Sequence, residues 1–201
     1  AYMLEAAGVD FIFLDNTNGA TYTAAEFLLF DTWKQIREEG GSTPDICVFG
    51  GSSSGAVLNN LRGSIYSDAN WDKYYDLFYK YEGKPLYLGK ESTFGDNLAW
   101  AKEHLTIRDC WAWQDADNTW SWMQEYKISP DGTEVQYVNG GPGRDANGKF
   151  EALALCIGHH PTTNKGRSYV NTVFPTVDND YGFSLDSGAG AGMAGQFEAI
   201  K

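Results

Sequence analysis

The sequence predicts an α/β fold, an incomplete (β/α)8 TIM barrel in which about five of the eight strands are present. Short, nearly continuous apolar runs alternate with segments of helical periodicity. Such runs are typical of parallel strands buried on both faces, and parallel neighbours need crossover connections that are usually helical. Helix-like segments at both ends favour a barrel domain over residues 1–201 that is truncated at both ends, with an open doubly wound sheet as the alternative.

The first part of the chain shows this alternation most clearly. Residues 2–6 are typical of the end of a helix, and the apolar run at 9–15 predicts a strand buried on both faces. Residues 23–41 predict the clearest helix, with aromatic and aliphatic side chains at three-residue steps and two glycines at its end. Thr23 and Glu26 have the spacing of a capping box at the start of that helix.

The pattern continues to residue 113 and then changes. We expect helices over 54–63, 70–83 and 92–104. We expect further buried strands over 45–49, 84–89, 105–113 and 152–158. Turn signals between residues 114 and 150 surround short alternating runs, which predicts an excursion that carries a β-hairpin. Residues 193–201 predict the first turns of another helix.

Composition narrows the class of partner. The 201 residues suit one domain, and 42% apolar residues are enough for a core. The formal net charge of −12 makes a broad phosphate-binding surface unfavourable, so we expect no nucleic acid partner. No apolar run approaches the ~20 residues that span a bilayer, so we expect no membrane-spanning segment.

The cysteines give no sign of a metal or disulfide framework. Cys47, Cys110 and Cys156 each lie in a strand-like apolar run, which predicts three buried thiols. Their spacing fits no zinc pattern, and no H-x-H or HExxH motif is present. We therefore expect no metal and no cofactor.

Polar residues at the strand ends are the candidate site. In both candidate folds the working surface lies beyond the carboxyl ends of the parallel strands. Asp15 ends the first of these strands, and Asn16 and Asn18 follow it. A carboxylate in that place is costly to desolvate unless it is hydrogen-bonded or used, which makes Asp15 the catalytic candidate. The alternative is that Asp15 caps its own loop in an Asx-type turn.

Histidines follow the last predicted strand. His159 and His160 are adjacent, and adjacent residues on an extended chain point to opposite sides. At most one of them is therefore expected to face a site. Arg167 lies a little further along the chain.

Tryptophan is concentrated near the fourth predicted strand, at positions 111, 113, 120 and 122. Indole faces are flat, apolar and electron-rich, and they stack well on the C–H faces of sugar rings. We expect at least one sugar platform here, with Trp111 and Trp113 at the strand end as the candidates. Packing in the core is the alternative for each tryptophan.

A G-x-S-x-G pattern spans residues 51–55 and makes Ser53 a candidate nucleophile. It follows a predicted strand and precedes a predicted helix, and the chain order Ser, Asp, His is the order that α/β-hydrolases use. However, no HGGG-like run for an oxyanion hole lies upstream, and the pattern is frequent where glycine and serine are abundant. The alternative interpretation is a tight loop at the end of a barrel strand.

Three segments carry a resemblance to a known group. "MLEAAGVDFIFLDNTNGATY" resembles the AGVDF-apolar-D-x-TN segment of glycoside hydrolases of the endo-α-mannosidase and α-1,3-glucanase types, families 99 and 71. "GKPLYLG" resembles their GKPLIIG-like strand, and "GHHP…KGRSY" resembles their QHP…GRS segment. The segments occur in the same order from about residue 1 to 170.

This resemblance implies a TIM barrel that acts on glycosidic bonds and a piece that covers roughly its third to seventh strands. It implies that Asp15 and Asn18 bind sugar hydroxyls, as do His160 and Arg167. In such enzymes the acid/base glutamates lie in a later GWNEW-like segment, so we expect them downstream of residue 201. The resemblance also favours an extracellular, periplasmic or cell-surface location.

The sequence thus predicts a fragment of a glycoside hydrolase for a poly- or oligosaccharide, inactive by itself. Asp15 is the catalytic candidate, and the predicted substrate-binding residues are Asn18, Trp111, Trp113, His160 and Arg167. Two alternatives stay open: a serine esterase that uses Ser53, and a sugar-binding protein without catalysis.

Overall fold

A computed structural model describes residues 1–111, 114, 116–121 and 142–152. It also describes the strand backbone of residues 125–128, 135–139, 159–160 and 165–166. The chain divides into two compact units, Ala1–Asp109 and Cys110–Lys201.

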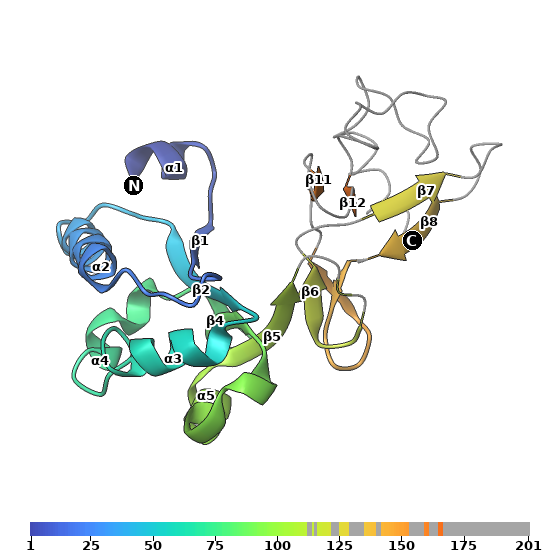
Figure 1. Cartoon of the computed structure of the whole chain (residues 1–201). Helices are drawn as coiled ribbons and strands as arrows, with labels where there is room; N and C mark the ends of the chain where they lie inside the picture. Colours follow the sequence, from blue (N-terminus) through green and yellow to red (C-terminus); the bar gives the residue numbers. More distant parts are fainter. Residues whose placement is uncertain are drawn as a thin grey trace. The chain divides into compact units, whose positions relative to one another are not determined.

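The first unit is built on parallel strands joined by helices. The strands, in sheet order, are β1 (Phe11–Asp15), β2 (Asp45–Gly51), β4 (Lys84–Gly89) and β5 (Thr106–Trp111), and all three pairings are parallel. The helices on their connections are α2 (Thr23–Glu38), α3 (Ser54–Arg62) and α5 (Leu98–His104), and a short α1 (Tyr2–Ala6) precedes β1 (Figure 1). The predicted α/β alternation of this part is confirmed. With the antiparallel strands described below for the second unit, the chain as described has a mixed α/β fold.

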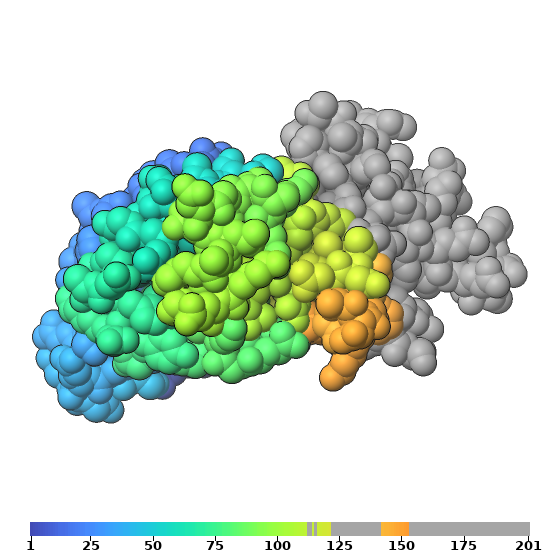
Figure 2. Space-filling view, turned by 90° about the horizontal axis from the view of Figure 1, so that it is seen from below, coloured from blue at the N-terminus to red at the C-terminus, as the bar shows by residue number. Residues whose placement is uncertain are grey.

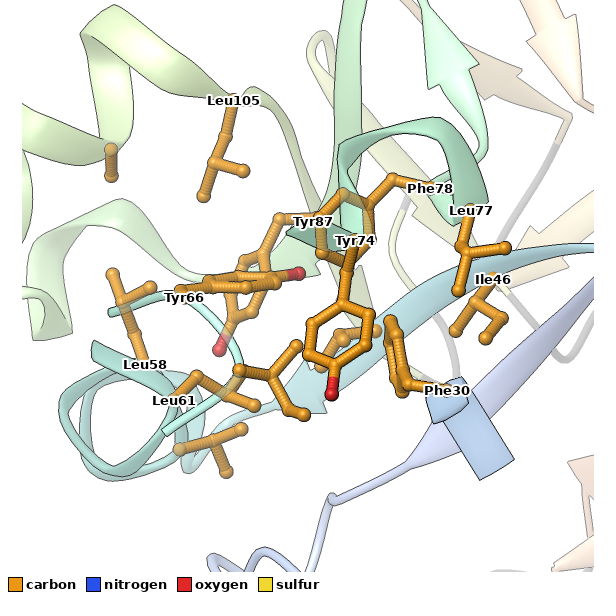
Figure 3. Packing of buried hydrophobic residues seen from close by; sticks show 14 of the residues in the cluster. Phe30, Ile46, Leu58, Leu61, Tyr66, Tyr74, Leu77, Phe78, Tyr87 and Leu105 are labelled. Atoms are coloured by element: carbon orange, nitrogen blue, oxygen red, sulfur yellow. The ribbon is translucent and has the colours of Figure 1, made fainter. Parts of the chain in front are cut away.

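The helices pack against one face of the parallel strands. Ile46 and Val48 point to this face, and Tyr87 lies level with Val48 on the neighbouring strand. The rings of Phe30 and Tyr74 meet edge to face at 5.2 Å (Figure 3). The largest fully buried side chains are Tyr66, Tyr74, Tyr87, Phe30, Phe78, Ile46, Leu58, Leu61 and Ile65. Five of these nine side chains are aromatic, so rings make up much of the core between the helices and the sheet.

Strand β1 is covered on one face rather than two. Ile12 and Leu14 pack against the core, whereas Phe13, on the opposite face, is 46% exposed. The prediction of burial on both faces is therefore wrong: the face that carries Ile12 and Leu14 is packed against the core, and the described residues leave Phe13 on the other face exposed.

The predicted helix over 70–83 is wrong in its second half. Only α4 (Trp71–Tyr74) and the 3-10 turn η1 (Tyr75–Leu77) are helical. The chain then forms β3 (Lys80–Tyr81), which pairs antiparallel with β4. The two residues of the connecting turn, Glu82 and Gly83, both have positive φ, at 53° and 83°. Two successive positive φ values are typical of the type I′ turn that closes tight hairpins.

Two other helix starts differ from the prediction. The predicted helix over 92–104 begins with the 3-10 turns η2 (Glu91–Thr93) and η3 (Gly95–Asn97) before α5. Helix α2 has Tyr22 rather than Thr23 as its N-cap. Glu26 Oε1 accepts from the amide of Tyr22 at 3.3 Å rather than from that of Thr23, and no described side chain caps the helix, so the predicted capping box is wrong.

In the second unit the described strands pair antiparallel. β6 (Thr119–Ser121) pairs with β9 (Gly143–Arg144), and β9 pairs with β10 (Phe150–Ala152). β7 (Glu125–Ile128) and β8 (Val135–Asn139) form the hairpin that the alternating run predicted. β11 (His159–His160) pairs with β12 (Lys165–Gly166). The predicted strand over 152–158 and the predicted helix over 193–201 lie outside the described residues, apart from Ala152 in β10.

Candidate functional site

The loops that follow β1, β2 and β4 leave the same edge of the sheet. Asp15 is level with Phe49 on β2, and Phe49 is level with Leu88 on β4. Because these strands are parallel, the polar residues beyond them collect at one edge of the first unit, as the strand-end rule predicts.

Asp15 closes its own loop. Its Oδ1 accepts from the Thr17 amide at 2.9 Å, which is the Asx-type turn that the sequence allowed. The side chain is exposed and also lines a cavity with Asn16. The turn occupies one of the two carboxylate oxygens of Asp15.

Asn16 and Glu26 form a buried polar pair ten residues apart. Asn16 is 2% exposed and Glu26 is 5% exposed. The Asn16 Nδ2 donates to Glu26 Oε1 at 3.1 Å and to the Ala20 carbonyl at 2.8 Å. The backbone N–H of Asn16 donates to the Phe49 carbonyl at 2.8 Å, and this bond holds the loop after β1 against β2.

Two oxygen atoms of this pair have no hydrogen-bond partner within the described part of the chain. They are Asn16 Oδ1 and Glu26 Oε2, and both are shielded from solvent. A buried acceptor without a donor is costly, and buried polar groups in folded proteins are nearly always paired. These two oxygen atoms are therefore acceptors that lack a hydrogen-bond donor among the described residues.

A cavity of about 250 Å³ lies at this pair. Its lining consists of Leu14, Asp15, Asn16, Tyr22, Ala25, Glu26 and Leu29. Tyr22 is 60% exposed, whereas the Asn16 and Glu26 side chains are buried. The cavity thus joins an apolar wall to two carboxylates and an amide at the end of β1, beside the amino end of α2.

The G-x-S-x-G segment is a packing junction. Ser53 is the N-cap of α3 with φ −94° and ψ 13°, which is not the strained backbone of a nucleophile elbow. The next residue, Ser54, is fully buried; its Oγ accepts from the Lys90 amide at 2.7 Å and lies 3.1 Å from Thr93 Oγ1. The serine-rich turn therefore fastens the loop after β2 to the loop after β4.

Glycine is required at this junction by close approach. A Cβ at Gly55 would lie 1.9 Å from the Thr93 carbonyl oxygen. Helix α3 and the η2–η3 turns are consequently in direct contact along one face of the first unit (Figure 2). The glycine and serine spacing that resembles a catalytic motif is explained here by packing.

The other predicted site residues are spread over different parts of the chain. Asn18 is exposed in the loop after β1. Trp111 is 39% exposed at the end of β5 and belongs to the second unit. Trp113, Arg167 and the side chain of His160 lie outside the described residues. The structure therefore brings Asp15 together with Asn16 and Glu26, and it does not test the other groupings.

Trp120 is a core residue of the second unit. It is 8% exposed, and its Nε1 donates to Glu151 Oε2 at 2.8 Å. Trp120 therefore packs in the core and is not an exposed platform for a sugar ring. Cys47 and Cys110 are buried thiols, as predicted, and Cys156 lies outside the described residues.

Sequence reasoning missed Glu26 as a site residue. Its position three residues after Thr23 was explained as a helix cap, and that explanation left no reason to look further. The signal that was present is Asn16, a polar residue directly after the strand-end Asp15. Only the fold shows that the amide of Asn16 meets the carboxylate of Glu26.

Neither a metal centre nor a membrane span is found in the described part of the chain. No group of three or more His, Cys, Asp or Glu side chains there is arranged to hold a metal ion. No described helix has both the length and the apolar character needed to cross a bilayer. No family model, curated protein or solved structure matched this sequence.

Proposed function

We propose that this chain is the substrate-binding part of a glycoside hydrolase whose cleft lies at the carboxyl edge of the parallel strands. The observation that carries the proposal is the cavity at the end of β1, where Asp15, Asn16 and Glu26 meet beside an aromatic ring. Carboxylate and amide oxygens accept hydrogen bonds from sugar hydroxyls, and aromatic rings stack on sugar C–H faces.

The strand arrangement supports the same proposal. Four parallel strands with helices on their connections are what an incomplete (β/α)8 barrel contains, and barrel enzymes carry their sites at this edge. Most glycosidases use two carboxyl groups flanking the scissile bond. In this proposal Asp15 is a supporting carboxylate that holds or polarises a sugar hydroxyl, and the acid/base pair is supplied elsewhere in the barrel.

The test is hydrolysis by the natural polypeptide that contains residues 1–201, whatever its length. We expect it to release reducing ends from at least one member of a panel of α- and β-linked polysaccharides, and Asp15→Asn to lower kcat by at least tenfold. Hydrolysis that Asp15→Asn leaves unchanged removes the role of Asp15. No hydrolysis of any glycan, together with labelling of Ser53 by a fluorophosphonate probe, replaces the proposal with a serine hydrolase.

A further inference from the structure

Two buried polar side chains beside the cavity at the end of β1 hold hydrogen-bond acceptors without partners in the described part of the chain, whereas their donors are already paired. Both N–H groups of the Asn16 amide are committed to acceptors of the protein. The backbone amide of Tyr22 is committed to Glu26. Among the side chains that line the cavity, the Tyr22 hydroxyl is the remaining donor, whereas Asn16 Oδ1 and Glu26 Oε2 have no partner.

The same cavity carries negative charge without a matching cation. Asp15 and Glu26 both line it, and neither takes part in an ion pair among the described residues. A buried carboxylate is normally paired with a cation or bound to a metal. Glu26 has only the Asn16 amide and the Tyr22 backbone amide as donors. A ligand that pairs with these groups therefore carries several hydrogen-bond donors and a positive charge.

We propose that this cavity binds a protonated primary amine. An ammonium group has three N–H donors and no acceptor, so it matches a wall of acceptors. One N–H donates to Glu26 Oε2, a second donates to Asn16 Oδ1, and the third faces Asp15. A sugar hydroxyl donates once and leaves the carboxylate charge unbalanced.

The volume sets the size of the molecule that carries the amine. About 250 Å³ lies just below the roughly 300 Å³ at which pockets for drug-sized ligands begin, so one ring fits. Tyr22, Leu14 and Leu29 offer apolar surface for the face of that ring. In the proposed function, on which this step rests, the ligand is an unacetylated amino-sugar unit of the substrate.

The amine reaches the two oxygens by moving one lining side chain, because both atoms are shielded from bulk water. Tyr22 is the side chain that moves at least cost, since it is 60% exposed and precedes the first turn of α2.

The experiment is isothermal titration calorimetry of the 201-residue chain with glucosamine, N-acetylglucosamine, glucose and methylamine at neutral pH. We expect glucosamine to bind at least tenfold more tightly than N-acetylglucosamine or glucose, and methylamine to compete with it. Glu26→Gln should weaken glucosamine binding at least tenfold. The matched control is Glu38→Gln, which removes the same charge from the exposed end of α2 and should leave the affinity within twofold.

Methyl NMR localises the effect and protects the test against a folding defect. Glucosamine should shift the Ala25 and Leu29 methyl signals. If Glu26→Gln does not fold, Asp15→Asn, which keeps the Asx turn, takes its place and should weaken glucosamine binding several-fold. Equal affinity for glucosamine and glucose overturns the proposal, as does a folded Glu26→Gln chain that binds as wild type. That second outcome is expected if a proton between Glu26 Oε2 and Asn16 Oδ1 already pairs the two atoms.

Failure of this proposal is separable from failure of the proposed function. Hydrolysis of neutral glycans without any preference for amines keeps the glycosidase and removes the amine site. Amine binding at Glu26 without hydrolysis of any glycan keeps the amine site and removes the glycosidase.

Discussion

The hydroxyl oxygen of Ser54 accepts a hydrogen bond of 2.7 Å from the backbone amide of Lys90. The backbone carbonyl of Ser54 accepts a second bond, of 2.8 Å, from the buried Tyr87 hydroxyl. One serine thus joins the start of α3 to strand β4 and to the loop that follows β4. This junction fixes two of the loops at the edge of the sheet where the candidate site lies.

Ser54→Ala is expected to lower the free energy of unfolding by about 1–3 kcal/mol, because it leaves the partly buried Lys90 amide without its acceptor. Urea unfolding followed by tryptophan fluorescence measures this. Ser52→Ala, at an exposed position of the same turn, is the control and should stay within about 0.5 kcal/mol of wild type. Equal effects of the two substitutions would show that the junction contributes nothing specific.

Gly55→Ala is expected to destabilise the chain by about 1–3 kcal/mol or more, because the added methyl overlaps the Thr93 carbonyl oxygen. Gly63→Ala is the matched comparison, since a Cβ there meets its nearest atom at 3.5 Å and the backbone φ is −87°. It should be neutral or stabilising by up to about 1 kcal/mol. A Gly55→Ala chain as stable as wild type would mean that the two loops are not in this contact.

Alkaline pH is expected to destabilise the fold through buried tyrosines. Burial raises the pKa of Tyr66 and of Tyr87 above the ordinary value of about 10. Their contribution to stability is complete below pH of about 10, where both states hold the proton. It is lost as pH rises further, because the unfolded chain releases protons that the folded chain keeps.

The measurement is the slope of unfolding free energy against pH between about pH 10 and 11.5, the range just above the ordinary tyrosine pKa. Tyr87→Phe should make the slope less negative by up to about 1.4 kcal/mol per pH unit, one proton's worth. Leu61→Val in the same core should lower stability equally at every pH. A slope that Tyr87→Phe does not change would count against burial as the cause.

Asp15→Asn and Asp15→Ala separate the turn from the site. Asparagine also accepts from the Thr17 amide, so Asp15→Asn should unfold at nearly the wild-type urea concentration. Asp15→Ala loses that acceptor at an exposed position, and we expect a cost of about 0.5–1 kcal/mol. If both variants lose glycan hydrolysis while only Asp15→Ala loses stability, the carboxylate charge itself acts in the site. Equal stability of the two variants would show that the Asx turn contributes little.

Helices and strands with strong periodicity could be predicted from the sequence. The helix expected over 23–41 is α2, and the strands expected over 45–49 and 84–89 are β2 and β4. These elements bury a regular stripe or a continuous run, so local pattern and tertiary packing agree. The segment over 70–83 failed because its aromatic spacing suits a helix, whereas the chain becomes extended at Phe78 and pairs with β4 through β3, before the turn at Glu82.

The candidate site was predictable only at Asp15. Strand ends are visible in a sequence, and the Asx turn follows from the residue types that come next. The partner of Asn16 was not visible, because the contact with Glu26 depends on how α2 packs beside β1. Glu26 lies near the start of a helix, where a capping role is enough to explain a glutamate. Its contact with Asn16 forms only when the chain folds, so the sequence pattern gave no sign of it.

The β3–β4 hairpin has a consequence for the order of folding. Its two-residue turn closes a very short loop, whereas Cys47 and Leu86 on the parallel neighbours β2 and β4 are 39 residues apart. The hairpin should therefore appear first and offer β4 as a ready template on which β2 docks later. In pulse-labelled hydrogen exchange, the Leu86 amide, bonded to Tyr79, should gain protection before the Tyr79 amide, which is bonded to Ile46. Simultaneous protection of both amides would mean that the template and its partner assemble in one step.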